Sequence, residues 1–297
     1  EGLPTATISQ NLRAASPQMQ ALNKALEKGD IDAAFAVLKP ETVEVPFAKG
    51  PETAARLWAD LKAREREATL LLASGRAMRS AANAAIQQER LKRGELQGPG
   101  QKLTVLDRVT ITREGARQMK GYRKGRVVQI RTNLPSQGLA RGDRGIVQGI
   151  DKGTVTLAMA DGSTRRFEPG RLPRNLAQDA VTIYEPKQLH LYPGDRIRWT
   201  ENDKEHGLLN GDLATVDRID QSAITVRTHD GQRVQLTTQD PKREKLDLAY
   251  AVNVHIAQGM TAKSGIILMS EREKMLNTTR AFLVAVARIA DRATLVV

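Results

Sequence analysis

The chain has 297 residues, a length that suits two or three domains better than one. Its 46 Lys and Arg against 34 Asp and Glu give a formal net charge of +12, which favours nucleic acid or an acidic protein face as partner, with a solvated basic surface as the alternative. It contains no Cys, which excludes a disulfide framework and suits a reducing compartment, and it shows neither a signal peptide nor an apolar run long enough to cross a bilayer.

Residues 16–94 show the periodicities of alternating helices and strands. Ser16 is placed to cap a helix that begins at Pro17 and stops at Gly29, and Asp30 can cap a second helix through Leu38. The other elements expected here are a strand at 42–46, an amphipathic helix at 52–67, an apolar strand at 68–73, and a helix from about Arg76 to Arg93, capped by Ser74 and closed by Gly94. The apolar run at 68–73 is typical of a strand in a sheet that is covered on both faces.

The middle of the chain repeats itself at an offset of 69 residues. Residues 122–167 align with residues 191–236 without a gap, and 12 of the 46 aligned positions are identical. The identical pairs include Gly125/Gly194, Gly142/Gly211, Asp143/Asp212, Asp151/Asp220, Asp161/Asp230 and Gly162/Gly231. We interpret the two segments as a duplication.

Each copy has the pattern of short strands joined by tight turns. A Gly-rich turn leads into an alternating strand (146–147 and 215–216), and a second short strand follows. Asp161-Gly162 and Asp230-Gly231 then stand where a type I′ hairpin turn needs positive φ at both central residues. Short strands with few aromatic residues predict two small β barrels of SH3-like or OB-like size.

The α/β pattern resumes after the second copy, with a buried strand at 264–270, an apolar-faced helix at 279–290 and a strand at 293–297. This order implies parallel pairing through crossover helices, so the β copies interrupt one α/β domain. We expect a lobe made of residues 1–110 and 246–297, a first repeat at 111–185 and a second repeat at 186–245.

The positive charge is concentrated in one segment. Residues 101–185 carry 16 basic and 8 acidic side chains, or +8 of the total of +12. The side chains expected to contact a phosphate backbone are Arg126, Arg131, Arg141, Arg144, Arg165 and Arg166, each with a solvated surface charge as its alternative. Aromatic residues make up only 3% of the chain, so stacking on bases is limited to the few candidates Tyr122, Tyr184, Tyr192 and Trp199.

Four stretches, in this order, resemble superfamily-1 helicases of the RecD class. "ATLLLASGRAMRSAANAAIQQERLKRGEL" is similar to the motif IV region, "LYPGDRIRWTENDKEHGLLNGDLATV" to the 2B barrel insert, "YAVNVHIAQGMT" to motif V and "LVAVARIADRATLVV" to motif VI. The resemblance extends over nearly the whole chain and is closest to the conjugative relaxase–helicases of the F family. It implies an α/β fold, the RecA-like second lobe (2A), interrupted by two tandem small β barrels, 2B-like and 2B.

Relaxase–helicases of this family contain an active and a degenerate, vestigial helicase segment, and the chain resembles the degenerate one. The resemblance implies a non-catalytic module that binds single-stranded DNA and serves as a translocation signal, recognised by the coupling ATPase of type IV secretion during plasmid conjugation. The parent protein would be a DNA-nicking relaxase and an ATP-dependent 5′–3′ helicase that uses ATP and Mg²⁺. It would be cytoplasmic and transferred to the recipient cell. The first residue is Glu1 rather than Met, so we expect a fragment, monomeric and without membrane insertion.

The chain lacks the phosphate-binding loop of an ATP motor, because no G-x-x-x-x-G-K-[ST] motif occurs. The resemblance places Ile256 and Asn253 where motif V usually has Lys and Thr. The motif remnants are His255, Gln258, Gly259 and Arg288. Two interpretations of them stay open: contact with nucleic acid or a nucleotide site, or a structural turn and an ion pair. We expect no catalytic residue, metal site or cofactor in this segment, since its four His residues show no ligand spacing.

Two other functions remain open from the sequence. The chain could be half of an active ATP-dependent helicase, in which Gln258 and Arg288 serve ATP hydrolysis once the missing lobe is present. It could also be a protein-binding β repeat with incidental charge.

Overall fold

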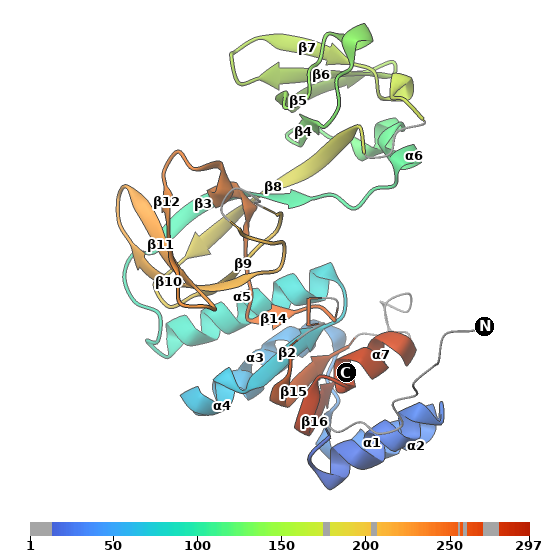
Figure 1. The fold of residues 1–297 in the computed structure, drawn as a ribbon, viewed down its shortest axis with the longest axis vertical. Helices are drawn as coiled ribbons and strands as arrows, with labels where there is room; N and C mark the ends of the chain where they lie inside the picture. The colour runs from blue at the N-terminus through green and yellow to red at the C-terminus, as the bar shows by residue number, and fades with distance from the viewer. Residues whose placement is uncertain (1–13, 175–178, 203–206, 255, 258–259, 270–278) are drawn as a thin grey trace, which may run out of the picture.

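The computed structural model describes residues 14–174, 179–202, 207–254, 256–257, 260–269 and 279–297. The helices are α1 (Pro17–Glu27), α2 (Ile31–Leu38), α3 (Gly50–Ala59), α4 (Ala63–Glu67), α5 (Arg76–Lys92), α6 (Arg113–Ala116) and α7 (Thr279–Val286). The strands are β1 (Thr42–Val43), β2 (Thr69–Ala73), β3 (Gln101–Arg108), β4 (Val127–Ile130), β5 (Arg144–Asp151), β6 (Thr154–Met159), β7 (Thr164–Phe167), β8 (Val181–Leu191), β9 (Arg196–Trp199), β10 (Leu213–Ile219), β11 (Ala223–Thr228), β12 (Arg233–Thr237), β13 (Leu246–Leu248), β14 (Ala251–Val252), β15 (Ala262–Leu268) and β16 (Ile289–Val296). They form three sheets, arranged along the long axis of the molecule (Figure 1).

The lobe sheet has the strand order β1-β16-β15-β2-β14, and its recorded pairings are all parallel. Alternate residues of β2 face opposite sides, as the pleat requires. Leu70 and Leu72 pack in the cluster that includes α1, α2 and α7, whereas Leu71 and Ala73 pack against α3 and α5. The sheet is therefore covered on both faces, as the apolar run at 68–73 predicted.

Capping residues set the first helix boundaries as predicted. The Ser16 hydroxyl accepts a hydrogen bond from the Met19 amide at 3.2 Å, and the Asp30 carboxylate accepts one from the Ala33 amide at 2.9 Å. Other boundaries differ from the prediction, and the strand expected at 42–46 is only Thr42–Val43 long. The helix expected at 52–67 is divided into α3 and α4, and the one expected at 279–290 ends at Val286, because the residues from Ile289 on pair with β15 as β16.

The two repeats share backbone hydrogen bonds at the offset of 69 residues. The Gly125 amide donates to the Val147 carbonyl at 2.8 Å, and the Gly194 amide donates to the Val216 carbonyl at 2.7 Å. Three further pairs of amide-to-carbonyl bonds match at the same offset. The bond from Gly142 to Ile130 matches that from Gly211 to Trp199, and the bond from Ile130 to Asp143 matches that from Trp199 to Asp212. The bond from Met159 to Ser163 matches that from Thr228 to Gln232. β5 and β10 also shift register at corresponding positions, after Val147 and Val216. The duplication predicted from the sequence is confirmed in the backbone.

The small closed barrels expected from the sequence are not formed within the described residues. The second-repeat sheet has the open order β12-β11-β10-β9-β13, and the first-repeat sheet has the open order β3-β8-β4-β5-β6-β7. In neither sheet does a recorded pairing join the two outer strands. The outer strands are used elsewhere, since β13 leads directly into the lobe strand β14 and β3 pairs along its whole length with β8.

The turns at Asp161-Gly162 and Asp230-Gly231 are not of type I′. Their glycines have positive φ, +81° and +87°, but the aspartates do not. The Asp161 carboxylate instead accepts from the Ser163 amide at 2.9 Å, so the side chain stabilises the turn and glycine completes it. Positive φ at both central residues occurs at Lys152 (41°) and Gly153 (85°), between β5 and β6.

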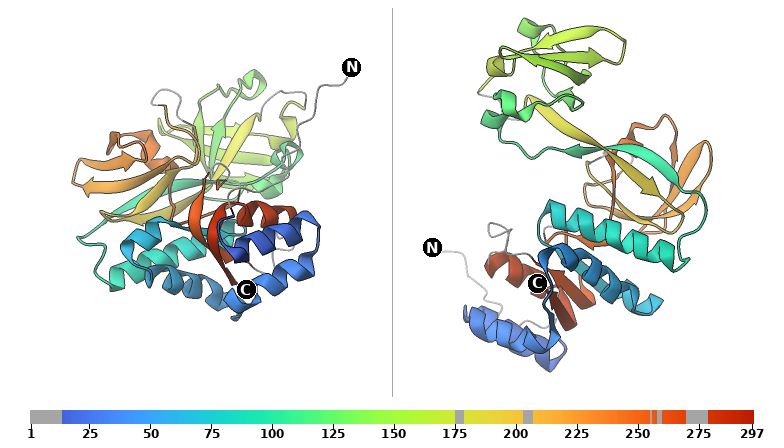
Figure 2. Two further views of the ribbon diagram at one scale, coloured as in Figure 1. Left: turned by 60° about the horizontal axis from the view of Figure 1, so that its bottom comes forward. Right: turned by 180° about the vertical axis from the view of Figure 1, so that it is seen from behind.

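One hydrophobic core runs through the lobe and the second repeat. It joins Trp58 of α3 and Ile86 of α5 to Leu103 and Leu189 of the β3–β8 ribbon and to Trp199 of β9. The first repeat has a separate core, which includes Tyr122, Val128, Val155, Leu157 and Phe167. The second repeat is consequently packed onto the lobe, while the first repeat stands at the far end of the β3–β8 ribbon (Figures 1 and 2).

Buried polar contacts also hold the second repeat on α5. The Asp195 carboxylate is fully buried and accepts hydrogen bonds from the Tyr250 hydroxyl at 2.5 Å and from Gln87 Nε2 at 2.7 Å. Arg90 Nη1 donates to the same Tyr250 oxygen at 2.7 Å. Burial raises the pKa of the Asp195 carboxyl, and burial also raises the pKa of the Tyr250 hydroxyl. At the corresponding position the first repeat has Arg126, so this contact belongs to the second copy alone.

Within the described residues, no helix combines the length and the apolar composition that crossing a bilayer requires.

Candidate nucleic-acid interface

A cleft of about 760 Å³ lies between the lobe, the second repeat and the end of β3. The lobe contributes the loop after β2, the first turns of α5 and the segment after β14, and the second repeat contributes the end of β9 and the turn before β10. The residues that line it are Ala73, Ser74, Gly75, Arg76, Arg79, Asp107, Arg108, Arg198, Thr200, Leu209, Asn210, Gly211, Asp212, Asn253, Val254 and Ile256. The carboxyl ends of parallel strands form one wall, which is where open α/β sheets commonly bind ligands.

The chain turns sharply from β2 into α5 at this wall. Gly75 is the N-cap residue of α5 and has φ of +73°, a conformation that glycine adopts without strain. Ser74 does not cap the helix as predicted, and no side chain of the described residues caps α5. The amides of the first helical turn therefore lack a side-chain acceptor, and the positive end of the helix dipole is at the cleft.

Four arginines and two aspartates set the charge of the cleft walls. Arg76 Nη1 lies 3.2 Å from the Asp107 carboxylate, and its Nη2 donates to the Thr110 hydroxyl at 3.0 Å. Arg108 is largely exposed, whereas Arg79 and Arg198 are buried, at 6% and 7% exposure. Among the lining residues the arginines exceed the aspartates by two, and Asp179 and Asp247, outside the lining, pair with Arg108 and with the two buried arginines.

A single buried carboxylate balances the two buried arginines. Asp247 lies 2.9 Å from Arg198 Nη2, 3.4 Å from Arg79 Nη2 and 2.8 Å from Lys187 Nζ. Burial alone would raise the pKa of the Asp247 carboxyl, but the charges of Lys187, Arg198 and Arg79 hold this pKa below its usual value. Three cations share one anion, so the cluster retains positive charge that an anionic ligand would offset.

Several polar atoms in the cleft walls lack a hydrogen-bond partner. They are Ser74 Oγ, Arg79 Nε, Arg198 Nε and Thr200 Oγ1, each buried and unpaired among the described residues. Unsatisfied buried polar atoms are uncommon in folded proteins and carry a desolvation cost. Their concentration in one cleft is typical of a binding site whose ligand completes the contacts.

The arginines predicted from the first repeat do not line this cleft. Arg126 is paired with Glu185 at 2.6 Å and is 12% exposed, and Arg144 makes a two-pronged contact with Glu244, at 2.6 and 3.0 Å, that ties the first repeat to the second. Arg165 donates to the Gly138 carbonyl. Arg131 is partly buried, and Arg141 and Arg166 are exposed. The six side chains are thus distributed over the first repeat. Three of them have structural partners, which are a carboxylate for Arg126 and Arg144 and a backbone carbonyl for Arg165.

The aromatic candidates are mostly core residues. Trp199 is 1% exposed, Tyr122 is 2% and Tyr184 is fully buried, and only Tyr192 is partly exposed. The fold therefore gives Trp199 no surface on which a base could stack. Its hydrophobic ring fills the core shared by the lobe and the second repeat, which explains why an aromatic residue is present there.

The motif remnants are only partly described. His255, Gln258 and Gly259 lie outside the described residues. Arg288 is partly buried between α7 and β16, and its Nε has no hydrogen-bond partner among the described residues. Arg288 precedes the first residue of β16, whereas the cleft follows the last residue of β2, so the two lie at opposite edges of the parallel sheet.

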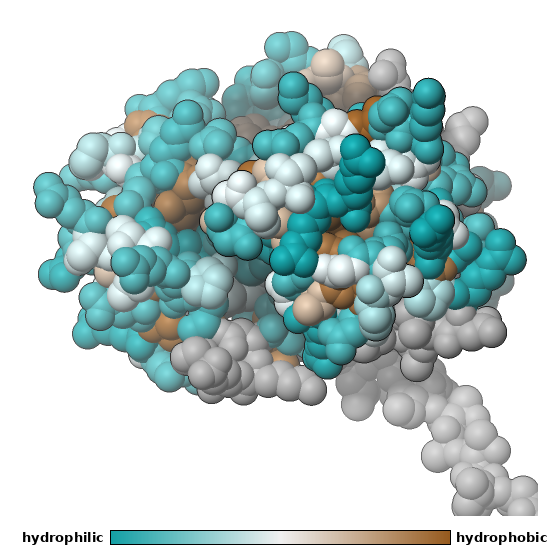
Figure 3. Space-filling model, turned by 90° about the horizontal axis from the view of Figure 1, so that it is seen from above, coloured by the Kyte–Doolittle hydropathy of each residue, from teal (hydrophilic) through white to brown (hydrophobic). Residues whose placement is uncertain are grey.

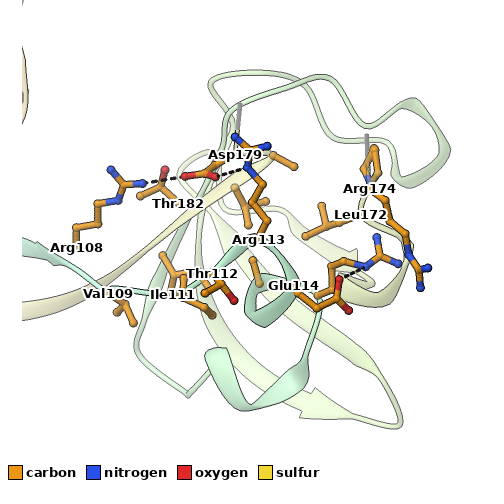
Figure 4. Close-up of a pocket in the computed structure, with 16 residues that line it drawn as sticks. Arg108, Val109, Ile111, Thr112, Arg113, Glu114, Leu172, Arg174, Asp179 and Thr182 are labelled. Atoms are coloured by element: carbon orange, nitrogen blue, oxygen red, sulfur yellow. Dashed lines mark hydrogen bonds and ion pairs between the residues drawn. The ribbon is translucent and has the colours of Figure 1, made fainter. Parts of the chain in front are cut away.

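A smaller hollow of about 110 Å³ lies on the first repeat, between α6, the end of β3 and the start of β8 (Figure 4). Asp179 bridges Arg108 and Arg113, at 2.9 and 3.2 Å, on one side of it. Ile111 and Leu172 line it, with Arg117, whose Nη1 is buried without a partner among the described residues. Most of the surface seen from the end of the first repeat is hydrophilic, with apolar residues in small separate spots (Figure 3).

Sequence reasoning missed the arginines of the cleft, Arg76, Arg79, Arg108 and Arg198. One signal was present, because "SGR" follows a fully apolar strand and opens a helix, the place where α/β sheets expose amides to ligands. Arg198 and Asp247 gave no such signal, since they meet only through the pairing of β9 with β13.

Comparison with known proteins finds sequence similarity to two curated proteins. No family model matches it. The chain is 29% identical over 236 residues to the multifunctional conjugation protein TraI of Escherichia coli. The aligned segment covers 78% of this chain and 13% of TraI. It is similar to one segment of TraI. TraI of Escherichia coli strain K12 is also 29% identical, over 203 residues, 68% of this chain and 11% of that protein.

Solved structures of Pif1 helicases show a weaker likeness. Bacteroides Pif1 bound to single-stranded DNA matches 96% of this chain and 50% of its own, with a TM-score of 0.45 and 14% sequence identity. Pif1 from Candida albicans matches 94% and 52%, with a TM-score of 0.29 and 15% identity. Both TM-scores are below 0.5, which is too low to assign a shared fold.

Proposed function

We propose that this chain is a non-catalytic, helicase-like segment of a TraI-like conjugation protein, and that it holds single-stranded DNA in the cleft. The convergence of four arginines and the uncapped N-terminus of α5 on that cleft carries the proposal. Guanidinium groups and helix amides are the donors that bind phosphate best in proteins. The similarity to a segment of TraI supports DNA as the source of the phosphates.

The cleft favours binding led by phosphates. Among the described residues, its walls are rich in arginine and contain no aromatic side chain. Binding should therefore be weakly selective for sequence and should weaken steeply with salt, by a slope of about −0.7 for each phosphate neutralised on a single strand. The arginines of the first repeat, Arg141, Arg165 and Arg166 above all, remain a second proposed contact for the same strand.

The test is a titration of a fluorescent single-stranded oligonucleotide at several salt concentrations. Arg76→Gln/Arg108→Gln should weaken binding and make the salt slope shallower by up to about 1.4, because two phosphate contacts would be lost. Both side chains are largely exposed, so the fold should tolerate the change. Arg165→Ala/Arg166→Ala tests the second proposed contact, in the first repeat, by the same titration.

The outcomes separate the site from the function. Loss confined to the cleft variant supports the cleft, and loss confined to the Arg165/Arg166 variant moves the site to the first repeat. Binding that is absent, or insensitive to salt, in the unaltered protein would reject DNA binding and favour a β repeat that binds protein.

We further propose that the segment is a translocation signal, recognised by the coupling ATPase of a type IV secretion system. The hollow on the first repeat supports this role. Its walls are partly apolar, and Arg117 Nη1 is buried without a partner among the described residues, which suits a protein partner with acidic side chains better than bare phosphates. Arg174→Glu at its rim should reduce both co-purification with the coupling ATPase and plasmid transfer. Lys152→Glu, on the β5–β6 turn of the same repeat, is the charge-matched control. Equal effects of the two variants would remove the hollow from the proposal.

The parent protein is proposed to be a relaxase and an ATP- and Mg²⁺-dependent 5′–3′ helicase that enters the recipient cell. The Nε of Arg288, which has no partner among the described residues, favours a second candidate function, in which this residue meets a nucleotide held by a missing lobe. Loss of ATP hydrolysis by the full-length parent on Arg288→Ala would support that alternative. Unchanged hydrolysis would leave Arg288 a structural residue.

A further inference from the structure

The duplication provides an internal comparison for one residue of the cleft. In the second repeat the Leu209 amide donates to the Asp212 carboxylate at 2.7 Å, and in the first repeat the Ala140 amide donates to the Asp143 carboxylate at 2.9 Å. The next amides make matching bonds too, from Asn210 to Asn202 at 2.7 Å and from Arg141 to Asn133 at 2.8 Å. The two turns thus have the same backbone, and the side chain at position 140 or 209 is not needed to form it.

The second repeat nevertheless places a large apolar side chain at the tip of this turn. Leu209 is 56% exposed, the highest value among the exposed large apolar residues of the described chain. Its neighbour Leu208, 4% exposed, already anchors the turn in the core, as Leu139 does in the first repeat. Leaving a leucine in water forgoes the stabilisation that its burial would bring. The fold gives no reason for leucine at this position, and alanine serves in the other copy.

The surroundings of Leu209 suggest what it contacts. The turn lies against the lobe segment after β14, where Ile256 Cγ1 and Cγ2 are 3.9 Å from the place of a β-carbon on Gly211. Leu209, Val254 and Ile256 all line the cleft that holds the four arginines. An apolar patch, made of these three side chains, therefore adjoins the arginines of the cleft wall. The backbone of a nucleic acid is anionic and its bases have apolar faces. The arginines therefore suit the phosphate of a nucleotide, and the apolar patch suits its base.

We propose that Leu209 and Ile256 form a subsite for a nucleobase, with the base face against Leu209 while the adjoining phosphates meet the arginines. The inference rests on the proposed function, that the cleft holds a single strand. Contact with the face of a base is tolerant of sequence, because every base has such a face. Leucine and isoleucine side chains are known to pack between or against bases in other DNA-binding proteins.

The test compares two oligothymidylate strands of equal length, one intact and one with abasic tetrahydrofuran sites at its central positions. Both carry the same phosphates, so the difference in their affinities measures base contacts. The unaltered protein should bind the abasic strand roughly three- to tenfold more weakly. Leu209→Ala should weaken binding of the intact strand by a similar factor and should abolish most of the difference between the two strands. Because Leu209 is exposed, the Leu209→Ala variant should fold normally, and a thermal melt checks this.

Ala140→Leu in the first repeat is the matched control, and it should leave both affinities unchanged. Equal affinity of the unaltered protein for the two strands, with binding that still weakens with salt, would overturn the subsite and leave the proposed function standing. An unchanged preference for the intact strand in Leu209→Ala would also overturn it. Absence of binding to either strand would reject the proposed function and, with it, the subsite.

Discussion

Removing the charge of Asp247 is expected to lower the free energy of unfolding more than removing any other single charge. Its side chain is 11% exposed and is the shared anion for Arg79, Arg198 and Lys187. Asp247→Asn keeps the volume of the side chain but leaves these cations without a counter-charge. Breaking a buried ion pair in this way costs about 3–5 kcal/mol. Lys187 is 30% exposed and can turn towards water, which places the expected loss in the free energy of unfolding near the lower figure, about 3 kcal/mol.

Urea denaturation followed by tryptophan fluorescence measures this loss, because both Trp58 and Trp199 lie in the core that the lobe and the second repeat share. Asp217→Asn is the control, since Asp217 also pairs with two arginines, Arg227 and Arg233, but these are 53% and 74% exposed. Exposed pairs contribute about 0–1 kcal/mol. A loss for Asp247→Asn no larger than for Asp217→Asn would refute the argument that burial makes the cluster dependent on its anion.

The same cluster predicts a pH dependence. The pKa of Asp247 is lowered in the folded state, so its stabilising contribution is present above the pKa of the unfolded chain, about 3.9, and is lost as pH falls through the lower folded value. The difference in stability between the unaltered protein and Asp247→Asn should therefore be complete at pH 7 and shrink below about pH 4. A difference that instead shrinks between pH 6 and pH 8 would assign the effect to another group.

Three further changes test the packing. Tyr250→Phe should lower the free energy of unfolding by about 1–3 kcal/mol in a urea titration, because the buried Asp195 carboxylate and Arg90 both lose a hydrogen-bond partner. A loss below about 0.5 kcal/mol, the size typical of surface substitutions, would contradict this. Gly265→Ala should lower the free energy of unfolding by about 1–3 kcal/mol, since a β-carbon there would clash with Ile289 Cδ1. Gly149→Ala, with no atom within 4 Å of the added β-carbon, should change it by no more than about 0.5 kcal/mol. Equal melting temperatures for the two variants would count against the described packing. Lys152→Asn should raise the melting temperature slightly, because Lys152 has φ of 41° and asparagine adopts positive φ more readily, and a lower melting temperature would contradict the assigned turn.

Much of the fold followed from local patterns. Ser16 and Asp30 marked the starts of α1 and α2 because an N-cap is a contact between neighbours in sequence. The continuous apolar run of β2 indicated a covered parallel strand because burial on both faces leaves no polar alternation. The repeat was visible because glycines with positive φ and turn aspartates recur wherever the backbone must repeat its path.

The sequence did not determine how the strands close or which charges meet. Whether β3 completes a barrel or extends as a ribbon depends on its contact with β8, about 80 residues later, and barrel closure leaves no mark on strand periodicity. Charge counting pointed to the first repeat because it sums residues along the chain. In the tertiary structure, by contrast, Glu185 and Glu244 pair one to one with two of those arginines, while Arg79 and Arg198, from distant segments, are brought together on the single carboxylate of Asp247. A charge acts through its neighbours in space, and only the packing of the second repeat on α5 decided which neighbours these are.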